Sequence, residues 1–475
     1  MEHSPHHNGS FNEQEGSART KAARVLSAIV FYGLIVLVLI TPVPYGSVEP
    51  WSQAAFQCAV FALGFLWCIQ AMLTGAWLAG DMRLFLPLVA ASAFAILQSL
   101  SWSQLNLAGV KVGNALSADP FESWIFALRL CALALAGMLA VRFTHNYLRL
   151  TILVNAVIIA GLSSAIFGIV RLTMQHRDGF VLAWLSAGGG FAQFINKNHF
   201  AFVAEPAIGL LAAIILLSRD AGHRKLLYLS TLILLWAALV MSRSRGGLLA
   251  GSVEMIVAGL FFIQAKRPST MGEGLARRTR SIGLAVVTVI AIMIVVAVTT
   301  MWLGGDQLST GVETAATEMS NRADDHEGSR RRDIWRATWQ MVKAHPIAGA
   351  GLGAYWAEIP MYHQANGVLT PQQAHNEYLE LLATGGLVGV ALFLWFALTL
   401  MQRIRRALAT FTGGQRAYAV GAIVGIVGVG VHSLVDFGLH MTGNALVFVM
   451  LLALLSLNKV DQRGLMQEHR TGAFH

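Results

Sequence analysis

Long apolar segments dominate this sequence and limit what it can fold into. A helix that crosses a bilayer needs about 20 mostly apolar residues, because unpaired backbone groups are costly in hydrocarbon. Twelve segments meet this requirement, although the last is short. They lie at about 24–43, 51–73, 84–100, 122–141, 149–170, 198–217, 225–241, 246–264, 282–303, 379–401, 417–436 and 443–458. Only 12% of the 475 residues are charged, against roughly 25% in soluble domains, which excludes a soluble cytosolic enzyme.

The segments predict an all-α integral membrane protein with about 12 transmembrane helices. The polytopic domain covers 24–458, and a long loop at 304–378 separates the ninth and tenth helices. Residues 1–23 are polar and have no signal-peptide pattern, so we expect a disordered tail there. Residues 459–475 form a second tail.

Basic residues predict the orientation in the membrane, because short cytoplasmic loops carry an excess of lysine and arginine. With the amino terminus inside, 21 of the 34 basic residues fall on the cytoplasmic side, 12 fall outside, and Arg129 lies within a predicted helix. Both tails should therefore be cytoplasmic. The net charge of +9 comes from a shortage of acidic residues in a chain poor in charge, so it does not indicate a nucleic-acid partner.

The turn at 242–251, SRSRGGLLAG, places Arg243 and Arg245 outside against this bias. Free amides at a helix start, together with two guanidinium groups, are typical of a phosphate or diphosphate site. The alternative is that the arginines only anchor the helix end at the lipid headgroups.

The segment 330–356 predicts an amphipathic helix on the membrane surface, followed by a glycine-rich loop. One face of the helix carries Trp335, Trp339 and Val342. The other carries Arg332, Arg336 and Lys343. Three glycines at 349, 351 and 353 would let the backbone approach a ligand, although a purely structural helix and turn fit equally well.

Polar residues occur where two other helices begin. His375, followed by Asn376 and Tyr378, lies where the chain re-enters the bilayer, and a histidine there could accept a proton from a sugar hydroxyl. An interfacial histidine bonded to a neighbouring helix is the alternative. The sixth helix starts with four consecutive polar residues that could bind sugar hydroxyls or merely cap the helix. These are Asn196, Lys197, Asn198 and His199.

Other charged residues have structural interpretations. His432 and Asp436 are one turn apart and predict a hydrogen-bonded pair, while intramembrane Arg129, Glu205 and Glu254 should pair with one another or with Asp436. The acidic residues lack the spacing of metal ligands, so metal-dependent catalysis is disfavoured and no metal or other cofactor is expected. The arginines would then neutralise a leaving diphosphate.

Taken in order, four motifs resemble the O-antigen ligase and polymerase superfamily of bacterial envelope glycosyltransferases. They are N-x-N-x-F at the sixth helix, S-R-S-R-G-G at the eighth, R-x-x-x-W with H-P-I-x-G-x-G in the long loop, and H-N-x-Y-L before the tenth helix. The likeness covers about residues 190–445 and implies a GT-C-like α-helical enzyme of the bacterial inner membrane. The active site would face the periplasm.

The resemblance also implies a reaction and roles for individual residues. An undecaprenyl-diphosphate-linked glycan would be transferred, without a metal and with inversion, to an acceptor hydroxyl. Carried over by position, His375 is the family histidine and Arg243 with Arg245 is the arginine pair. A loop arginine falls within 330–336 and is assigned to Arg332, while Arg336 would join the substrate-binding residues.

The acceptor distinguishes two activities within this superfamily. A ligase would use a lipid A core sugar, and a polymerase would use another lipid-linked repeat. We favour a ligase, and a capsule or exopolysaccharide polymerase, a ligase acting on protein and a transporter of the lipid-linked sugar remain alternatives. No internal repeat between the two halves of the chain supports a transporter.

Overall fold

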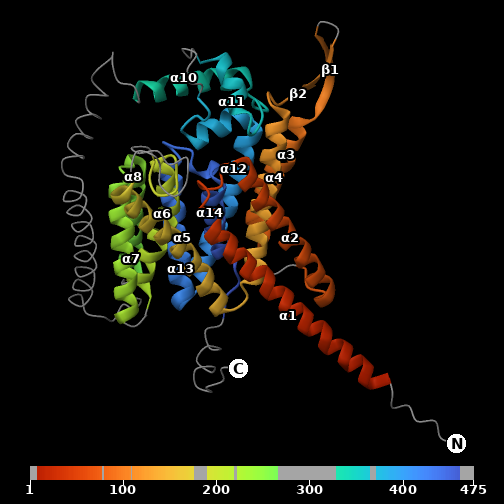
Figure 1. Cartoon of the computed structure of the whole chain (residues 1–475), viewed down its shortest axis with the longest axis vertical. Helices are drawn as coiled ribbons and strands as arrows, with labels where there is room; N and C mark the ends of the chain where they lie inside the picture. The colour runs from red at the N-terminus through yellow and green to blue at the C-terminus, as the bar shows by residue number, and fades with distance from the viewer. Residues whose placement is uncertain are drawn as a thin grey trace, which may run out of the picture.

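The structure, a computed structural model, describes residues 8–77, 80–107, 110–175, 190–218, 222–265, 328–363 and 371–460. Within this part of the chain, ten helices are long and apolar enough to cross a membrane. The prediction of an all-α multi-pass membrane protein is therefore confirmed (Figure 1). The ten helices are α1 (Asn8–Ile40), α2 (Pro50–Thr74), α3 (Leu86–Ser99, preceded by the 3-10 turn η1, Met82–Phe85), α4 (Pro120–Phe143), α5 (Tyr147–Met174), α6 (Lys197–Leu217), α7 (Gly222–Met241), α8 (Arg245–Ala265), α12 (Glu377–Thr410) and α13 (Gly413–His432).

Two of the twelve predicted helices are not among these ten. The segment 282–303 lies outside the described residues. The segment 443–458 corresponds to α14 (Thr442–Ser456), whose 15 residues span only about 22 Å at 1.5 Å per residue, less than the hydrocarbon thickness of about 30 Å. The number of full crossings therefore stays a prediction.

Secondary structure departs from expectation at two places. The first helix, α1, begins at Asn8, so the prediction of a disordered tail over 1–23 is wrong from residue 8 onward. Ala, Glu, Gln, Lys and Arg, which favour helix, make up half of residues 8–23 and extend the apolar helix beyond its membrane segment. A β-hairpin, β1 (Ser101–Leu107) paired antiparallel with β2 (Val110–Ala115), also joins α3 to α4.

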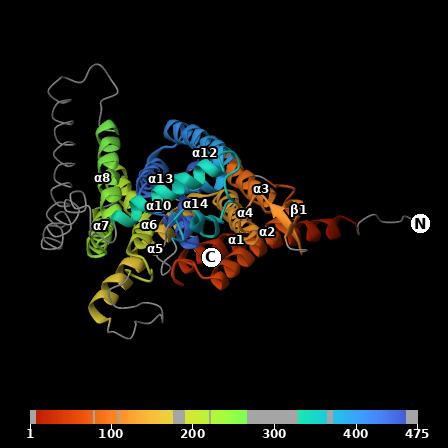
Figure 2. The same ribbon diagram turned by 90° about the horizontal axis from the view of Figure 1, so that it is seen from above.

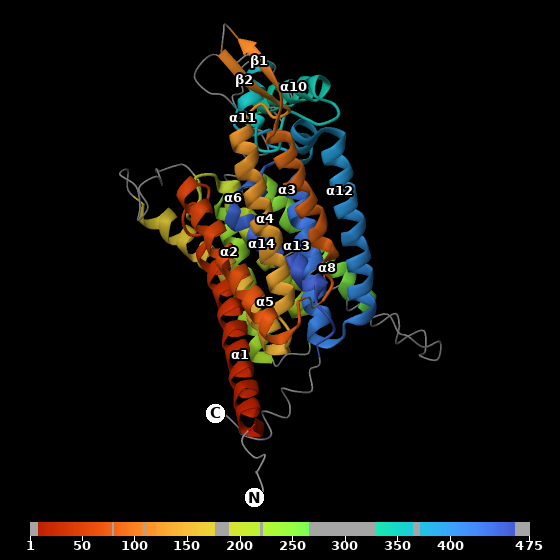
Figure 3. The same cartoon turned by 90° about the vertical axis from the view of Figure 1, so that its right-hand side faces the viewer.

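One end of the helical bundle carries a small cap, and we call it the site end. The cap consists of α10 (Gly328–Ala344), α11 (Tyr355–Glu358) and the 3-10 turn η2 (Ile359–Met361), with the β-hairpin beside it (Figures 1 and 3). Seen from above, α10 lies across the middle of the bundle (Figure 2). The three cap elements α10, α11 and η2 come from the predicted long loop 304–378, of which 304–327 and 364–370 lie outside the described residues.

Two glycines allow α6 and α13 to pack closely in the core. A Cβ on Gly209 would lie 2.5 Å from the backbone nitrogen of Gly425, and one on Gly421 would lie 2.7 Å from the Cα of Leu210. Only glycine permits this approach, as in other close crossings of membrane helices. The contact brings the first turn of α6 next to the chain that follows α13.

The longest membrane helix, α12, is interrupted near its start and held at its far end. Gly386 has φ +57°, which breaks the helical backbone one residue after Gly385. At the opposite end, buried Arg403 binds Asp81 at 2.8 Å and donates to the carbonyl of Leu455 at 2.8 Å. The helix is thus held to η1 and α14 at that end, and its first turns can pack against the cap.

Candidate functional site

The turn between α7 and α8 buries its serines and exposes its arginines. Ser242 and Ser244 are buried, and Ser244 Oγ accepts a hydrogen bond from the amide of Gly247 at 3.1 Å, which caps α8. Arg243 has φ +57°, a conformation that costs free energy for a residue with a side chain. Arg243 and Arg245 are both exposed at the site end. The structure thus places the two predicted arginines on one short, braced turn.

A chain of side-chain hydrogen bonds runs from this turn to Asp436. Ser244 Oγ donates to Asn198 Oδ1 at 2.7 Å, and the side-chain nitrogen Nδ2 of Asn198 donates to Asp436 Oδ2. The side-chain Oδ1 of Asn196, the N-cap of α6, accepts a hydrogen bond from the backbone nitrogen of Asn198 at 2.9 Å. Of the four polar residues predicted for substrate binding at this helix start, Asn196 and Asn198 are therefore engaged within the protein.

His375 reaches the same carboxylate from the other side. Its Nδ1 lies 3.5 Å from Asp436 Oδ1, and its imidazole packs edge-on against Phe437 with a centroid distance of 4.7 Å. His199, which is buried, packs edge-on against the same ring at 4.9 Å. His375 also has a left-handed backbone, with φ +51°. Two candidate functional residues, Arg243 and His375, are thus held in strained conformations by the packing around them.

Asp436 is fully buried, yet its surroundings favour the ionised form. Burial opposes ionisation, but His375, His199 and the amide of Phe437 together hold the pKa of this carboxyl well below its usual range. The amide of Phe437 donates to Asp436 Oδ1 at 2.8 Å. An anionic Asp436 can orient the imidazole of His375 through Nδ1 and stabilise its protonated form, leaving Nε2 for a substrate.

A second polar cluster holds the loop that carries His375. In the turn η3 (Gly438–His440), His440 Nδ1 lies 3.3 Å from Glu377 Oε2 and its Nε2 lies 3.0 Å from Glu380 Oε1. Glu380 also accepts from the amide of Ala374 at 2.8 Å, directly before His375. Arg129 of α4 donates to the carbonyl of His440 at 2.8 Å. The first half of the chain therefore supports the loop through Arg129.

The α10 helix contacts this loop as well, through Trp335. The indole of Trp335 donates to the carbonyl of Ala374 at 2.9 Å, while Trp339 is 48% exposed. The face buried against the cap and α12 consists of Ile334, Ala337, Thr338, Met341 and Val342. Val342, the third residue of the expected face, belongs to this buried surface, whereas Trp339 stays exposed, so the placement of the tryptophans in the membrane interface stays a prediction.

The predicted arginines of α10 lie on its exposed side. Arg332 is exposed, and Arg336 binds Asp333 at 3.0 Å, one turn earlier on the same helix. Such an exposed pair contributes little to stability. The role of Arg332 and Arg336 in binding substrate stays a prediction.

The glycines of the cap approach protein rather than an open ligand space. A Cβ on Gly349 would lie 2.2 Å from the carbonyl carbon of Thr384, and one on Gly351 would lie 2.2 Å from Ser117 Oγ. Their φ angles are +69° and +110°. Of the two interpretations of these glycines, the structure favours the structural one, because Gly349 and Gly351 let the cap lie directly on the backbone of α12 and on the residues just before α4.

The remaining predicted residues have defined positions. Asn376 is the N-cap of α12 and accepts from the amide of Leu379 at 3.0 Å, and Tyr378 donates to the carbonyl of Gly430 at 2.8 Å. Lys197 is half-buried in the first turn of α6. Their part in substrate binding is untested.

The expected pairing of His432 with Asp436 is wrong. His432 Nδ1 instead lies 2.6 Å from Glu205 Oε1, inside the bundle between α13 and α6, and both side chains are fully buried. Asp436 lies beyond the end of α13, where the chain turns toward His375. The segment HSLVDFGLH contains Asp436 and His440, and two histidines with an aspartate so close together at a helix end could have indicated a functional loop.

Among the described residues, no group of three or more His, Cys, Asp or Glu is arranged to hold a metal ion. The sequence model of the O-antigen ligase family matches residues 230–394. This match confirms the resemblance to the O-antigen ligase and polymerase superfamily over a segment that includes the α7–α8 turn, α10 and His375. Asn198 and Asp436 lie outside the matched segment. No curated protein matches the chain.

Replacing Gly349 by alanine should prevent the cap from packing on α12, because the new Cβ would overlap the backbone of Thr384. We expect a severe loss of folded protein after detergent extraction, measured by size-exclusion chromatography. Gly222→Ala is the matched control, since a Cβ there meets nothing within 4 Å. A well-folded Gly349→Ala variant would contradict the proposed packing role.

Stability should depend on pH through His440. Burial lowers the pKa of His440, but Glu377 and Glu380 outweigh it and raise that pKa to about 10. A raised pKa contributes stability that is complete below the unfolded value of about 6.5 and is lost as pH rises through about 10. The wild-type thermal midpoint should therefore fall between pH 7 and pH 10, and His440→Gln should lose most of this slope. An unchanged slope would contradict the assignment.

Proposed function

Since residues 230–394 match the O-antigen ligase family, we propose that the protein is a glycosyltransferase of the bacterial inner membrane. It transfers a glycan from undecaprenyl diphosphate to an acceptor hydroxyl, with inversion and without a metal ion. The site end faces the periplasm and both termini lie in the cytoplasm, as the distribution of basic residues indicates.

One observation carries the proposal. A continuous chain of contacts, from Ser244 through Asn198 to Asp436 and on to His375, joins the cationic turn to a histidine. A group that can accept a proton and a pair of groups that can neutralise a leaving anion are thereby held in one framework. Glycosyl transfer from a diphosphate requires both of these functions.

In the proposed reaction, the acceptor oxygen attacks the anomeric carbon of the donor sugar. A new carbon–oxygen bond forms as the bond from that carbon to the diphosphate oxygen breaks, and the diphosphate leaves with the electron pair. His375 Nε2 accepts the hydroxyl proton, and anionic Asp436 stabilises the resulting imidazolium through Nδ1. A single displacement of this kind inverts the anomeric centre.

The arginines stabilise the charge that develops on the diphosphate. Arg243 and Arg245 are exposed beside the capped start of α8, whose dipole also favours an anion. Diphosphate is a good leaving group, so this stabilisation replaces a separate general acid. Arg332 would complete the anion site, and Arg336, Lys197, His199, Asn376 and Tyr378 would contact sugars or the diphosphate.

The acceptor decides between two activities with the same donor chemistry. We favour a ligase that uses a lipid A core sugar, with a polymerase that uses a second lipid-linked repeat as the alternative. Envelope glycan from a deletion strain distinguishes them. Loss of attachment with unchanged chain length indicates a ligase, and accumulation of single repeats indicates a polymerase. Transfer by purified protein in detergent would exclude a transporter.

The double variant Arg243→Ala, Arg245→Ala should lose transfer by more than about 10³-fold, since removing a single charge-stabilising donor costs about 10²–10³ in other enzymes. Transfer from a labelled lipid-linked donor in detergent measures this loss. Arg224→Ala, an exposed arginine near the opposite end of α7, is the control. Near-normal transfer by the double variant, with normal expression, would remove the proposal.

His375→Ala should reduce transfer by about 10²–10⁴-fold. Asp436→Asn keeps the shape of the side chain and removes its charge, so it should lower kcat far more than it raises KM. If His375 accepts the proton, added imidazole should restore part of the activity of His375→Ala but none of that of Asp436→Asn. High residual activity of His375→Ala without imidazole would show that His375 is not the proton acceptor and only positions the acceptor hydroxyl.

A further inference from the structure

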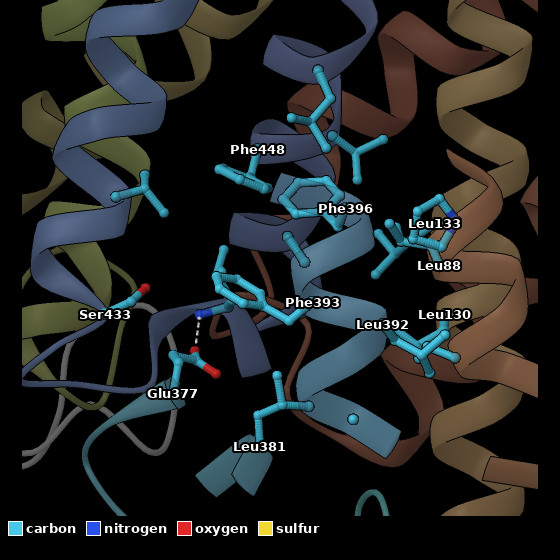
Figure 4. Close-up of a pocket in the computed structure, with 18 of the residues that line it drawn as sticks. Leu88, Leu130, Leu133, Glu377, Leu381, Leu392, Phe393, Phe396, Ser433 and Phe448 are labelled. Carbon is cyan, nitrogen blue, oxygen red and sulfur yellow. Dashed lines mark hydrogen bonds between the residues drawn. The ribbon is translucent and has the colours of Figure 1, made fainter. Parts of the chain in front are cut away.

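An apolar groove lies between α12 and the rest of the bundle. Its volume is about 390 Å³, and its walls come from α3 and α4 on one side and α12 on the other, with α13 and α14 at its base. Figure 4 shows Leu88, Leu130 and Leu133 opposite the α12 side chains Leu392 and Phe396, and Phe448 of α14 also borders this space. Almost all of the lining is hydrocarbon.

The groove is long and narrow. Along α12 its lining residues run from Gly389 to Leu400, which is about 17 Å at 1.5 Å per residue, and the groove continues past the break to Glu377 at the site end. It also includes Pro87, the second residue of α3, near the opposite end of the bundle. One leaflet contributes only about 15 Å of hydrocarbon, half of the total of about 30 Å. The groove therefore extends through more than one leaflet.

The charged side chains at the site end of the groove contact one another or the backbone, and the hydroxyl of Ser433 there has no hydrogen-bond partner. His440 lies between Glu377 and Glu380, and Arg129 donates to the carbonyl of His440. The lining thus offers a bound molecule mainly hydrocarbon contact, and any charged headgroup must lie beyond this end. Two residues before Glu377 is His375, so the groove leads to the candidate site.

We propose that this groove binds the polyprenyl chain of the lipid-linked glycan donor, an inference that rests on the proposed function. A phospholipid or lipid A carries several chains, each confined to one leaflet. A polyprenyl chain is single and long enough to fill a narrow groove that crosses the midplane. Its diphosphate end would leave the groove beside His375, from where it can reach the arginine turn.

Binding can be measured separately from transfer. Undecaprenyl phosphate and farnesyl phosphate serve as probes, and native mass spectrometry with thermal shift measures binding to the purified full-length protein. Undecaprenyl phosphate should bind at least tenfold more tightly than farnesyl phosphate, because only the longer chain fills the groove. Equal binding of the two, or equal displacement by a phospholipid, would overturn the proposal.

Two variants fill the groove from opposite walls. Ala397→Phe on α12 and Ala91→Phe on α3 should each weaken binding of undecaprenyl phosphate at least tenfold. The control, Ala391→Phe, adds the same ring at an exposed position of α12 that does not line the groove, and it should bind like the wild type. If both groove variants fold and bind normally, the groove is not the chain site. The comparison of chain lengths needs only the wild type, so it holds even if a variant is unstable.

The arginine double variant separates this inference from the proposed function. It should lose transfer and still bind undecaprenyl phosphate more tightly than farnesyl phosphate, because the chain contacts remain. Tight binding that depends on chain length, in a wild-type protein that performs no transfer, would leave the groove valid and reject the glycosyltransferase. Transfer activity that the groove-filling variants retain would reject the groove alone.

Discussion

The buried carboxylate of Asp436 is the interaction on which the candidate site depends. It lies where three parts of the chain meet, namely the start of α6, the segment after α13 and the loop before α12. A buried anion is stable only when charged or hydrogen-bonding groups surround it, and Asn198, His375 and the amide of Phe437 provide these partners. The same contacts that satisfy Asp436 set the position of His375 relative to the arginine turn.

The strained backbones at Arg243 and His375 fit this arrangement. Each has a positive φ that costs free energy, and each is overdetermined by neighbours, the buried serines in one case and the Glu380 and Trp335 contacts on Ala374 in the other. The glycine contacts of the cap on α12 add to this support. A rigid framework of this kind keeps charge-stabilising groups oriented before substrate arrives, which is what electrostatic catalysis requires.

The amino-terminal half of the chain lies outside the matched family segment, yet the structure gives it two roles. Arg129 supports the turn that holds Glu377 and Glu380, and α3 with α4 forms one wall of the apolar groove. The groove and the charged site meet at His440 and Glu377. The proposed lipid-linked donor has the same division into a long apolar chain and a charged head.

The amino-acid sequence by itself determined the membrane helices, the arginine turn and the position of His375, because apolar length and local polar motifs are properties of consecutive residues. It could not determine partners far apart in the chain, so His432 was assigned to Asp436 on helical spacing although its ring lies against Glu205. Likewise, the sequence left open whether the cap glycines approach a ligand or only form a turn, because it does not tell which protein surface lies against them. Only the tertiary structure decided these points, since the packing of α6 against α13 brings Asn198 to Asp436, and the loop before α12 brings His375 to the same carboxylate.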